Sequence, residues 1–318
     1  MNILVTGGAG FIGSNLVESL LENKEVKLVR VFDNLSTGHL SNLKEFRTHS
    51  KFEFFEGDVR STEDCTKACE DINAISHQAG LGSVPRSIND PLSTHNVNVN
   101  GFINLLESAR AQNIKRIVYA SSSSVYGDLN ESPKKENKVG KVLSPYAASK
   151  MTTELYAEAF ARNYNMTMVG LRYFNVFGPK QDPNGPYAAV IPLFIKAALT
   201  NTSPLINGDG TITRDFTPVS NVVQINTNGL LLNLDDARHY IVNVACGQTN
   251  DLNSIWGMIK NITGTKSEAT YGPNRQGDIM FSLADIDFAK KELDYHLRVG
   301  LNTEMERTIN YFQNNLLG

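Results

Sequence analysis

Cysteine is scarce in this sequence, which holds only three in 318 residues. An odd and sparse set does not suit a disulfide framework and fits a reducing cytoplasm. Cys65 and Cys69 lie four residues apart on a predicted short helix, but a metal site there would need further ligands, and His77, the nearest histidine in sequence, ends a predicted strand. We therefore interpret the cysteines, which include Cys246, as small buried side chains and predict no bound metal.

Long apolar runs and a surplus of one charge sign are also absent. No stretch approaches the roughly 20 apolar residues needed to span a bilayer, and the formal net charge is only -3. Neither nucleic acid nor a membrane is therefore indicated as a partner. The first residues, Met1–Thr6, carry no positively charged start or cleavage site. They predict a buried strand rather than a secretion signal, and hence a cytoplasmic protein.

Strand-like and helical runs alternate through the first half of the chain. Several strand candidates are continuous apolar runs, as in parallel strands that are covered on both faces. The predicted strands are Ile3–Val5, Leu28–Phe32, Phe52–Phe55, Ala74–His77, Arg116–Ala120 and Met168–Tyr173. In the predicted helix Phe11–Asn23 the apolar residues form one stripe. This alternation predicts an α/β fold with a doubly wound parallel sheet.

A glycine-rich turn follows the first predicted strand and opens the first predicted helix. Gly7, Gly10 and Gly13 in Thr-Gly-Gly-Ala-Gly-Phe-Ile-Gly permit a tight turn, a close backbone approach and close packing of helix on strand. The free N–H groups and the positive dipole end of the helix then suit a pyrophosphate. Because a strand precedes the glycines and a helix follows them, the pattern predicts a Rossmann-type dinucleotide site.

Two aspartates follow the next strands. Asp33 ends the second strand about 20 residues after Gly13, where a carboxylate accepts hydrogen bonds from a ribose diol and repels a 2′-phosphate. This favours NAD over NADP, although an Asp33 that only forms a turn before Asn34 stays open. Asp58 follows the third strand, where it is placed to hold the adenine, and an ordinary turn aspartate is the alternative.

The second half of the chain is less regular and is punctuated by Gly, Pro and Asn. No long linker or internal repeat sets it apart. We predict an NAD-binding Rossmann domain over residues 1–174, with later elements near residues 219–244 returning to it. Residues 175–318 are predicted to form a smaller C-terminal α/β cap that binds the substrate.

Residues that suit proton transfer follow the fifth strand. Ser121–Ser124 stand at its end, and a helix with Pro145 in its first turn is predicted to run to about Ala161. Tyr146 and Lys150 are four residues apart and share one face of this helix. A free phenol with a pKa of ~10 is a poor base, but a nearby ammonium and a nicotinamide ring favour phenolate. Tyr146 can then take a proton from a substrate hydroxyl, although Tyr-x-x-x-Lys alone also arises by chance.

Taken together, these motifs resemble the extended short-chain dehydrogenase/reductase family over nearly the whole chain. The segment Leu171–Gly178 completes the family pattern. The resemblance implies NAD in the N-terminal domain and Ser122, Tyr146 and Lys150 as catalytic residues. The residues implied for cofactor binding are Gly7, Gly10, Phe11, Ile12, Gly13, Asp33, Asn34, Ser36, Thr37, Gly38, Asp58, Val59, Gln78, Ala79, Gly80, Asn98, Tyr146, Lys150 and Tyr173.

The resemblance also implies a nucleoside-diphosphate sugar in the cap. The residues implied for its binding are Gly82, Ser83, Ser122, Ser123, Tyr146, Asn175, Ala189, Val190, Leu205, Asn207, Arg214, Arg275, Asp278 and Ser282. Leu205 and Asn207 are expected to hold the base. Arg214 and Arg275 are expected to clamp the phosphates, a role that suits guanidinium geometry. For each arginine a surface ion pair is the alternative.

The residues after Ser122 narrow the reaction that the resemblance implies. The family's dehydratases carry an Asp-Glu pair there and its decarboxylating members usually a Glu, whereas this chain has Ser123 and Ser124. Without these carboxylates, 4-epimerisation of a UDP-hexose through a transient 4-keto sugar is expected. Tyr146 deprotonates the 4-hydroxyl as hydride passes to NAD, the keto sugar turns in the pocket, and hydride returns to the opposite face.

Substrate preference is a further expectation. Gly82–Ser87 is similar to the version in epimerases that act on UDP-N-acetylglucosamine and UDP-N-acetylgalactosamine. Ser282 stands where galactose-restricted epimerases carry a tyrosine, so a small side chain leaves room for an N-acetyl group. A polar loop residue without this role is the alternative. The competing functions are epimerisation of UDP-glucose and UDP-galactose only, or of UDP-glucuronate.

A function of another class, a non-catalytic NAD(H)-binding regulator, is also open. Such proteins typically lose the tyrosine or the lysine, and this chain keeps both Tyr146 and Lys150. Related enzymes pair two helices from each subunit into a bundle. The corresponding helices here are roughly Leu92–Ala111 and Pro145–Ala161, which implies a homodimer.

Overall fold

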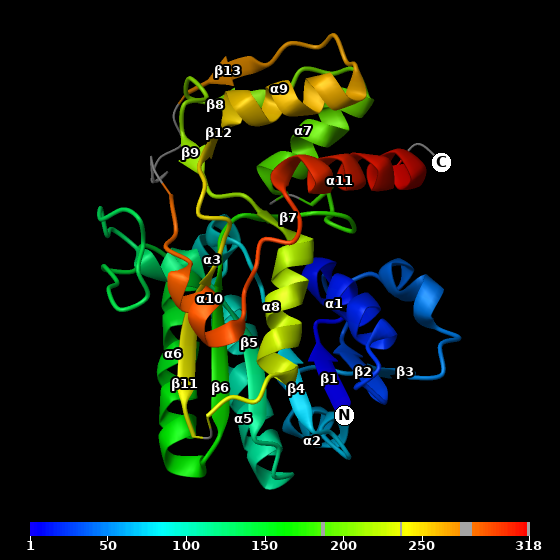
Figure 1. Cartoon of the computed structure of the whole chain (residues 1–318), viewed down its shortest axis with the longest axis vertical. Coiled ribbons are helices and arrows are strands. Elements are labelled where there is room, and N and C mark those ends of the chain that lie inside the picture. Colours follow the sequence, from blue (N-terminus) through cyan, green and yellow to red (C-terminus); the bar gives the residue numbers. More distant parts are fainter. Residues whose placement is uncertain (186–187, 236, 274–281, 317–318) are drawn as a thin grey trace.

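The structure is a computed structural model that describes residues 1–185, 188–235, 237–273 and 282–316. A seven-stranded parallel sheet forms its centre (Figure 1). The strand order is β11-β6-β5-β4-β1-β2-β3, and every pairing is parallel. The strands are β1 Asn2–Thr6, β2 Leu28–Asp33, β3 Phe52–Glu56, β4 Ala74–His77, β5 Arg116–Ser122, β6 Thr167–Tyr173 and β11 His239–Val244. Each of the six predicted strands lies within one of these. The order reverses between β1 and β4, which is where such sheets bind ligands.

Helices cover both faces of this sheet (Figure 1). On one face α1 (Phe11–Glu22) packs against α8 (Val219–Leu231). The other face is covered by α2 Thr62–Ala68, α5 Gly101–Ala111 and α6 Pro145–Tyr164. The apolar stripe of α1 is buried in the core beneath it, as its spacing predicts. The predicted doubly wound α/β fold is therefore confirmed.

The predicted helix Leu92–Ala111 is divided into three parts. α4 (Pro91–His95) runs into a π-helical turn at Asn96–Asn100, which continues as α5. The turn brings the side chain of Asn98 inward, where it is buried. π-Helical turns are rare and often occur at functional sites, and sequence periodicity does not reveal them.

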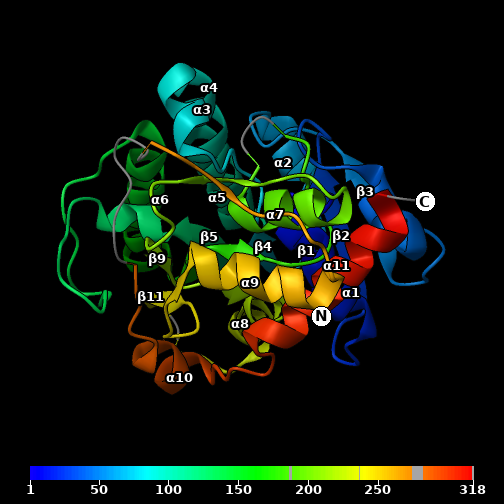
Figure 2. The same ribbon diagram turned by 90° about the horizontal axis from the view of Figure 1, so that it is seen from above.

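A smaller unit lies over the carboxyl ends of the strands (Figures 1 and 2). Its helices α7 (Val190–Leu199), α9 (Leu252–Thr263) and α11 (Leu301–Leu316) share an apolar cluster that includes Phe194 and Trp256. Its short strands are β7 Val176–Phe177, β8 Leu205–Asn207, β9 Thr213–Arg214, β10 Thr217–Pro218, β12 Asn250–Asp251 and β13 Thr270–Gly272. This unit is the expected cap.

The remaining short elements connect the longer helices and strands. They are the 3₁₀ turns η1 Leu40–Phe46 and η3 Ser123–Tyr126 and the helices α3 Val84–Asn89 and α10 Asp287–Leu293. Between β10 and the cap's later elements the chain returns to the sheet, because α8 packs on it and β11 pairs with β6. The domain boundary at residue 174 stays a prediction.

Two features are absent from the described residues. No helix there is long and apolar enough to cross a membrane. The same residues hold no group of three or more histidine, cysteine or acidic side chains arranged for a metal ion. Cys65 and Cys69 are both buried, on α2 and at its C-terminal cap.

Candidate active site

A cavity of about 510 Å³ opens at the carboxyl ends of the central strands. It brings together predicted residues from every motif. Those that line it are Gly7, Gly10, Phe11, Ile12, Gly13, Asp33, Asn34, Ser36, Thr37, Gly38, Val59, Gln78, Ala79, Gly80, Gly82, Ser122, Ser123, Tyr146, Lys150, Tyr173 and Asn175. Ser121, expected only as part of the serine run, also lines it, as do Leu81, Val97 and Gln181, which the sequence did not single out. The last three carry no recognisable motif.

Other predicted site residues lie away from this cavity. Ser83 caps α3, where its hydroxyl accepts a hydrogen bond from the Arg86 amide. Ala189 precedes α7, Arg214 lies on β9, and Ser282 is half-buried. Val190, Leu205 and Asn207 line a second cavity of about 530 Å³ in the cap. Arg275 and Asp278 lie outside the described residues. Their roles stay predictions.

The glycine turn has no room for side chains. Gly7 has a φ of +66°, and a Cβ there would lie 2.6 Å from the backbone nitrogen of Ala79. A Cβ at Gly13 would lie 2.2 Å from the carbonyl oxygen of Gly7. α1 begins at Phe11 without a side-chain cap at Gly10. Its first N–H groups and the positive end of its dipole therefore suit a pyrophosphate, and this cradle fits NAD.

Asp33 stands at the end of β2, where its buried carboxylate joins two parts of the cofactor wall. Oδ2 accepts a hydrogen bond from the Ala9 amide at 2.9 Å, and Oδ1 accepts one from the Leu35 amide at 2.8 Å. Burial raises the pKa of Asp33, and these two bonds oppose that shift. A carboxylate held in this place fits a ribose diol rather than a 2′-phosphate.

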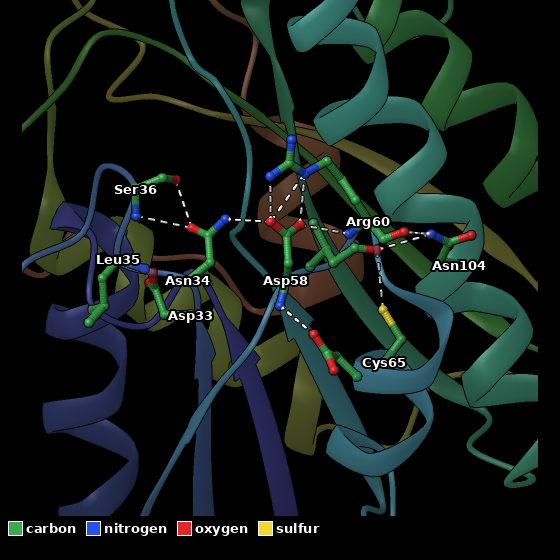
Figure 3. Close-up of polar contacts among 10 residues, drawn as sticks. Asp33, Asn34, Leu35, Ser36, Asp58, Arg60, Cys65 and Asn104 are labelled. Atoms are coloured by element: carbon green, nitrogen blue, oxygen red, sulfur yellow. Dashed lines mark hydrogen bonds and ion pairs between the residues drawn. The ribbon is translucent and has the colours of Figure 1, made fainter.

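Asp58 does not line the cavity but organises a loop that does (Figure 3). Arg60 donates to both carboxylate oxygens, from Nε at 3.0 and 3.1 Å and from Nη2 at 2.6 Å, and lowers the pKa of Asp58 to about 2. Asn34 donates to Asp58 Oδ2 at 2.8 Å, while its own Oδ1 accepts from the amide and the hydroxyl of Ser36. The carboxylate is thus occupied by protein donors. Sequence reasoning missed Arg60, whose signal was its place two residues after Asp58.

Asn98 lies behind the cavity wall. Its Oδ1 accepts from the Leu81 amide at 2.7 Å, and its Nδ2 donates to the Leu81 carbonyl and to Ser149 Oγ. The amide group therefore holds the Gly80–Gly82 loop in place. A direct contact of Asn98 with a cofactor stays a prediction.

A buried network of amides and a phenol supports the wall between β4 and β6. Tyr173 donates to Gln78 Oε1 at 3.0 Å and accepts from Asn226 Nδ2 at 2.9 Å. Gln78 Nε2 donates in turn to Ser76 and Asn226. Asn226 was not predicted, because α8 carries three asparagines, Asn221, Asn226 and Asn228, and its sequence does not show which of them joins this network.

The start of α6 places the two residues that were expected to transfer protons. Ser144 caps the helix by accepting from the Ala147 amide, and Pro145 occupies the first turn. Tyr146 and Lys150 then point from the same face into the cavity. Lys150 Nζ donates to the carbonyl of Ala120 on β5 at 2.8 Å.

The electrostatics of this pair differ from the expectation. Burial raises the pKa of Tyr146, opposed by a hydrogen bond with the Ser122 hydroxyl. The Lys150 ammonium, expected to lower that pKa, is not among these influences. Burial itself lowers the pKa of Lys150 to about 8, against the opposing effect of Glu154. The protein alone thus keeps the phenol protonated, and a cationic nicotinamide ring is the remaining charge that can favour phenolate.

These features define an enzyme that binds a dinucleotide and carries a serine, a tyrosine and a lysine at the switch point of its sheet. A sequence model of the NAD dependent epimerase/dehydratase family matches residues 3–245, and the chain belongs to this family. It is 38% identical to a putative UDP-glucose 4-epimerase of Methanocaldococcus jannaschii, over 98% of this chain and 99% of that protein.

Two solved structures share the fold. One is a UDP-N-acetylglucosamine 4-epimerase from Methanobrevibacter ruminantium in complex with UDP-N-acetylmuramic acid, with a TM-score of 0.92 and 36% identity over 98% of each chain. The other is a UDP-glucose 4-epimerase from Thermotoga maritima with UDP-glucose, with a TM-score of 0.92 and 34% identity over 99% of this chain and 100% of that chain. The predicted family, its cofactor NAD and an epimerase type of enzyme are thereby confirmed.

Proposed function

We propose that this chain catalyses the NAD-dependent 4-epimerisation of a UDP-hexose through a transient 4-keto sugar. The observation that carries the proposal is the meeting of Ser122, Tyr146 and Lys150 in the cavity that the glycine turn and Asp33 also line. Ser122 and Tyr146 come from β5 and α6, both line the cavity, and Ser122 is close enough to the phenol to oppose the rise in its pKa. They offer a place for one substrate hydroxyl.

Each of these residues has a distinct role in the proposed reaction. Tyr146 accepts the proton of the 4-hydroxyl and later returns it, Ser122 orients the sugar oxygen, and Lys150 supplies positive charge at the pocket floor. NAD, when bound, takes up and returns the hydride. Among the described lining residues Asp33 is the only acid, and it lies at the cofactor end beside Asn34. Elimination of water would need its own acid and base near Ser122, so this distribution supports epimerisation.

The second cavity supports a base site in the cap. Val190 lies at the start of α7, and Leu205 and Asn207 lie at the two ends of β8. An apolar wall with a few amide and hydroxyl groups is typical of a small-molecule site. We assign the uracil to this cavity and the phosphates to Arg214, Arg275 and Asn175.

For the sugar we propose UDP-N-acetylglucosamine and UDP-N-acetylgalactosamine as the main substrates, with UDP-glucose and UDP-galactose also accepted. A Cβ added at Gly82 would meet nothing within 4 Å, so the wall here leaves free space. Ser282 adds only a small side chain at its position. The 4-epimerase from Methanobrevibacter ruminantium, an N-acetyl-sugar enzyme by name, supports the same preference.

Incubation with UDP-N-acetylglucosamine tests this proposal. We expect chromatography to show UDP-N-acetylgalactosamine forming until the two sugars reach equilibrium. Conversion of UDP-galactose but not of the N-acetylated sugar would remove the substrate preference and leave the reaction. Conversion of neither of these nor of UDP-glucuronate, by protein that binds NAD, would remove the reaction as well.

The variant Ser282→Tyr tests the steric part of the preference. A phenol ring at residue 282 is expected to fill the volume needed by the N-acetyl group, because packed pockets have little slack. We expect turnover of UDP-N-acetylglucosamine to fall about tenfold to 100-fold relative to UDP-galactose, the range that one badly fitting group produces. Ser282→Ala is the matched control and should leave the ratio unchanged. An equal fall for both sugars would contradict a steric filter.

We also propose a homodimer, formed through helices next to the active site. α3 and α4 pack against α6, and the exposed fractions of Ile88, Leu92 and Leu155 are 61%, 76% and 65%. Large apolar side chains gathered on neighbouring helices indicate an interaction surface. Light scattering is expected to give twice the chain mass, and the double variant Leu92→Glu/Leu155→Glu should give a monomer. A wild-type monomer at micromolar concentration would disprove the dimer.

A cytoplasmic location and a domain boundary near residue 174 complete the proposal. The location is supported by the three cysteines, none of which forms a disulfide. The boundary is supported by the separate apolar cluster of the cap.

A further inference from the structure

Glu154 on α6 and Arg172 on β6 form a buried ion pair directly behind the active site. The distances from Arg172 Nε to Glu154 Oε1 and from Arg172 Nη2 to Glu154 Oε2 are 2.9 and 2.8 Å. The side chains of Arg172 and Glu154 are only 5% and 7% exposed. Neither residue lines the cavity. Removing two charges from water can cost more free energy than their mutual attraction returns. A buried ion pair therefore does not by itself indicate a stabilising role.

The glutamate of this pair holds the start of the segment that carries the serine. Ser121 Oγ donates to Glu154 Oε1 at 2.6 Å. One residue earlier, the carbonyl of Ala120 accepts from Lys150 at 2.8 Å. The end of β5 is thus bound to α6 at two successive residues immediately before Ser122.

The arginine holds the other end of the same segment. Its guanidinium carbon lies 4.9 Å from the centre of the Tyr126 ring, at the last residue of η3. Arg172 Nη1 also donates to the carbonyl of Glu136 at 3.1 Å, in the loop that leads on to α6. Tyr126 is further held by its hydroxyl, which donates to Asn243 Oδ1 at 2.6 Å. One ion pair therefore contacts both ends of the turn that presents Ser122 and Ser123.

The pair also sets the charge around Lys150. Glu154 lies one helical turn beyond Lys150 and raises the pKa of that lysine, against the lowering by burial. The titratable and charged groups around Lys150 and Glu154 are Tyr146 on α6, His77 on β4, Tyr119 on β5, Arg172 on β6 and His239 on β11. Burial keeps His77 neutral at pH 7, since it lowers its pKa to about 3.

We propose that Glu154 and Arg172 are positioning residues for the epimerase reaction. Together they hold Ser122 against the Tyr146 phenol, and Glu154 keeps an anion one turn from the Lys150 ammonium. They act through these three residues and contact neither sugar nor cofactor. This inference rests on the proposed function only for its activity readout.

Two variants separate the geometric part from the electrostatic part. Ser121→Ala removes one hydroxyl and leaves the ion pair, so kcat should fall about tenfold, as expected from a displaced catalytic group, with KM and the alkaline limb of the pH profile unchanged. Glu154→Gln also removes the anion and leaves Arg172 in place. In this variant the alkaline limb of the pH profile of kcat should therefore move to lower pH, because Lys150 loses its proton more easily. Glu158→Gln, one turn further on, is the matched control, because Glu158 bonds to His239 and Arg162 instead.

Hydrogen exchange provides a readout that does not depend on turnover. Deuterium uptake over residues 120–127 should rise in Ser121→Ala and Glu154→Gln and stay at the wild-type level in Glu158→Gln. Unchanged kcat and uptake in Ser121→Ala would overturn the proposal, even if Glu154→Gln fails to fold. The proposal would also be overturned if Glu154→Gln and Glu158→Gln had equal effects on kcat, on the alkaline limb of the pH profile and on deuterium uptake. A wild-type protein without epimerase activity would remove the proposed function, while the exchange result would still decide whether the pair orders the serine turn.

Discussion

The two cavities of this protein are built in different ways. The cofactor end of the first is formed by backbone, since a Cβ at Gly7 or Gly13 would overlap main-chain atoms at 2.6 and 2.2 Å. The cap cavity is formed by side chains such as Leu193 and Leu205, which are 44% and 62% exposed. A wall of backbone admits few substitutions, whereas a wall of side chains can change one residue at a time. The shape of the glycine turn is therefore fixed by the main chain, whereas the cap cavity is open to change by substitution.

The two regions also differ in how they bury polar groups. The sheet region contains the buried His77, the His239 side chain, which is 5% exposed, the Glu154–Arg172 pair and the Gln78 network. In the cap, the apolar cluster shared by α7, α9 and α11 is accompanied by two buried acids, Glu304 on α11 and Asp215, whose pKa burial raises to about 6. Buried histidine and a buried ion pair are thus features of the sheet region, whereas the cap buries acids. The following predictions test this difference.

Removing the phenol of Tyr146 should have the largest effect. Tyr146→Phe deletes the proposed proton acceptor and leaves the glycine turn intact. We expect kcat to fall about 10³-fold, within the range for loss of a general base, while NAD stays bound. Turnover by chromatography and bound NAD by absorbance after denaturation check both parts. Wild-type turnover would show that another group accepts the proton.

Adding a methyl group to the backbone wall should weaken the cofactor site strongly. In Gly13→Ala the new Cβ meets the Gly7 carbonyl, which cannot move without opening the turn. Overpacking of this kind costs about 1–3 kcal/mol, which corresponds to NAD binding weaker by roughly tenfold to 100-fold. Calorimetric titration with NAD measures it. An unchanged Kd would mean that Gly13 does not pack closely against the Gly7 carbonyl in the NAD-bound protein.

The same difference explains how much could be predicted from the sequence. The strands, the glycine turn and the start of α6 follow from local patterns, because apolar runs, Gly spacing and Pro145 act on their own neighbours. The predicted cavity residues are therefore largely those that line it. The π-helical turn at Asn96–Asn100 and the occupied carboxylate of Asp58 were not predictable in this way. Asn98 in the π-helical turn bonds to the distant Leu81, and Asp58 is bonded to Asn34 on another loop as well as to its near neighbour Arg60.

The ion pair behind the active site was missed for the same reason. Glu154 and Arg172 are ordinary residues of a helix and a strand, and only the crossing of α6 over β5 and β6 brings them together. In the cap, the short strands and loops around Arg214 carry no periodicity that fixes their place. The roles of these residues came from family resemblance rather than from pattern.

Acid should destabilise the sheet region through His77. Burial and the charge of Lys150 lower the pKa of His77 from its ordinary 6.5 to about 3. The stability contributed by the neutral ring is complete above pH 6.5 and is lost as the pH falls toward 3, since the unfolded chain binds the proton first. Between pH 7 and pH 5 this loss amounts to about 2 kcal/mol.

The variant His77→Gln isolates this contribution from those of other groups. Denaturant unfolding of both proteins at pH 7 and pH 5 gives four free energies. The stability of the wild type relative to the variant should decrease by about 2 kcal/mol between the two pH values. A pH-independent difference would contradict a neutral buried ring.

The smallest effect is expected at a glycine in the cap, which serves as the counterpart to Gly13. Gly257 lies within α9, and a Cβ there would meet nothing within 4 Å. Alanine restricts the unfolded chain more than glycine does, so Gly257→Ala should stabilise the protein by about 0.5–1 kcal/mol. Thermal unfolding measures the change, and NAD affinity should remain that of the wild type. Both glycines are helical, and both changes add one methyl group. Opposite outcomes at residues 13 and 257 would therefore show that contact with the backbone, and not helix propensity, distinguishes the cofactor wall from the cap.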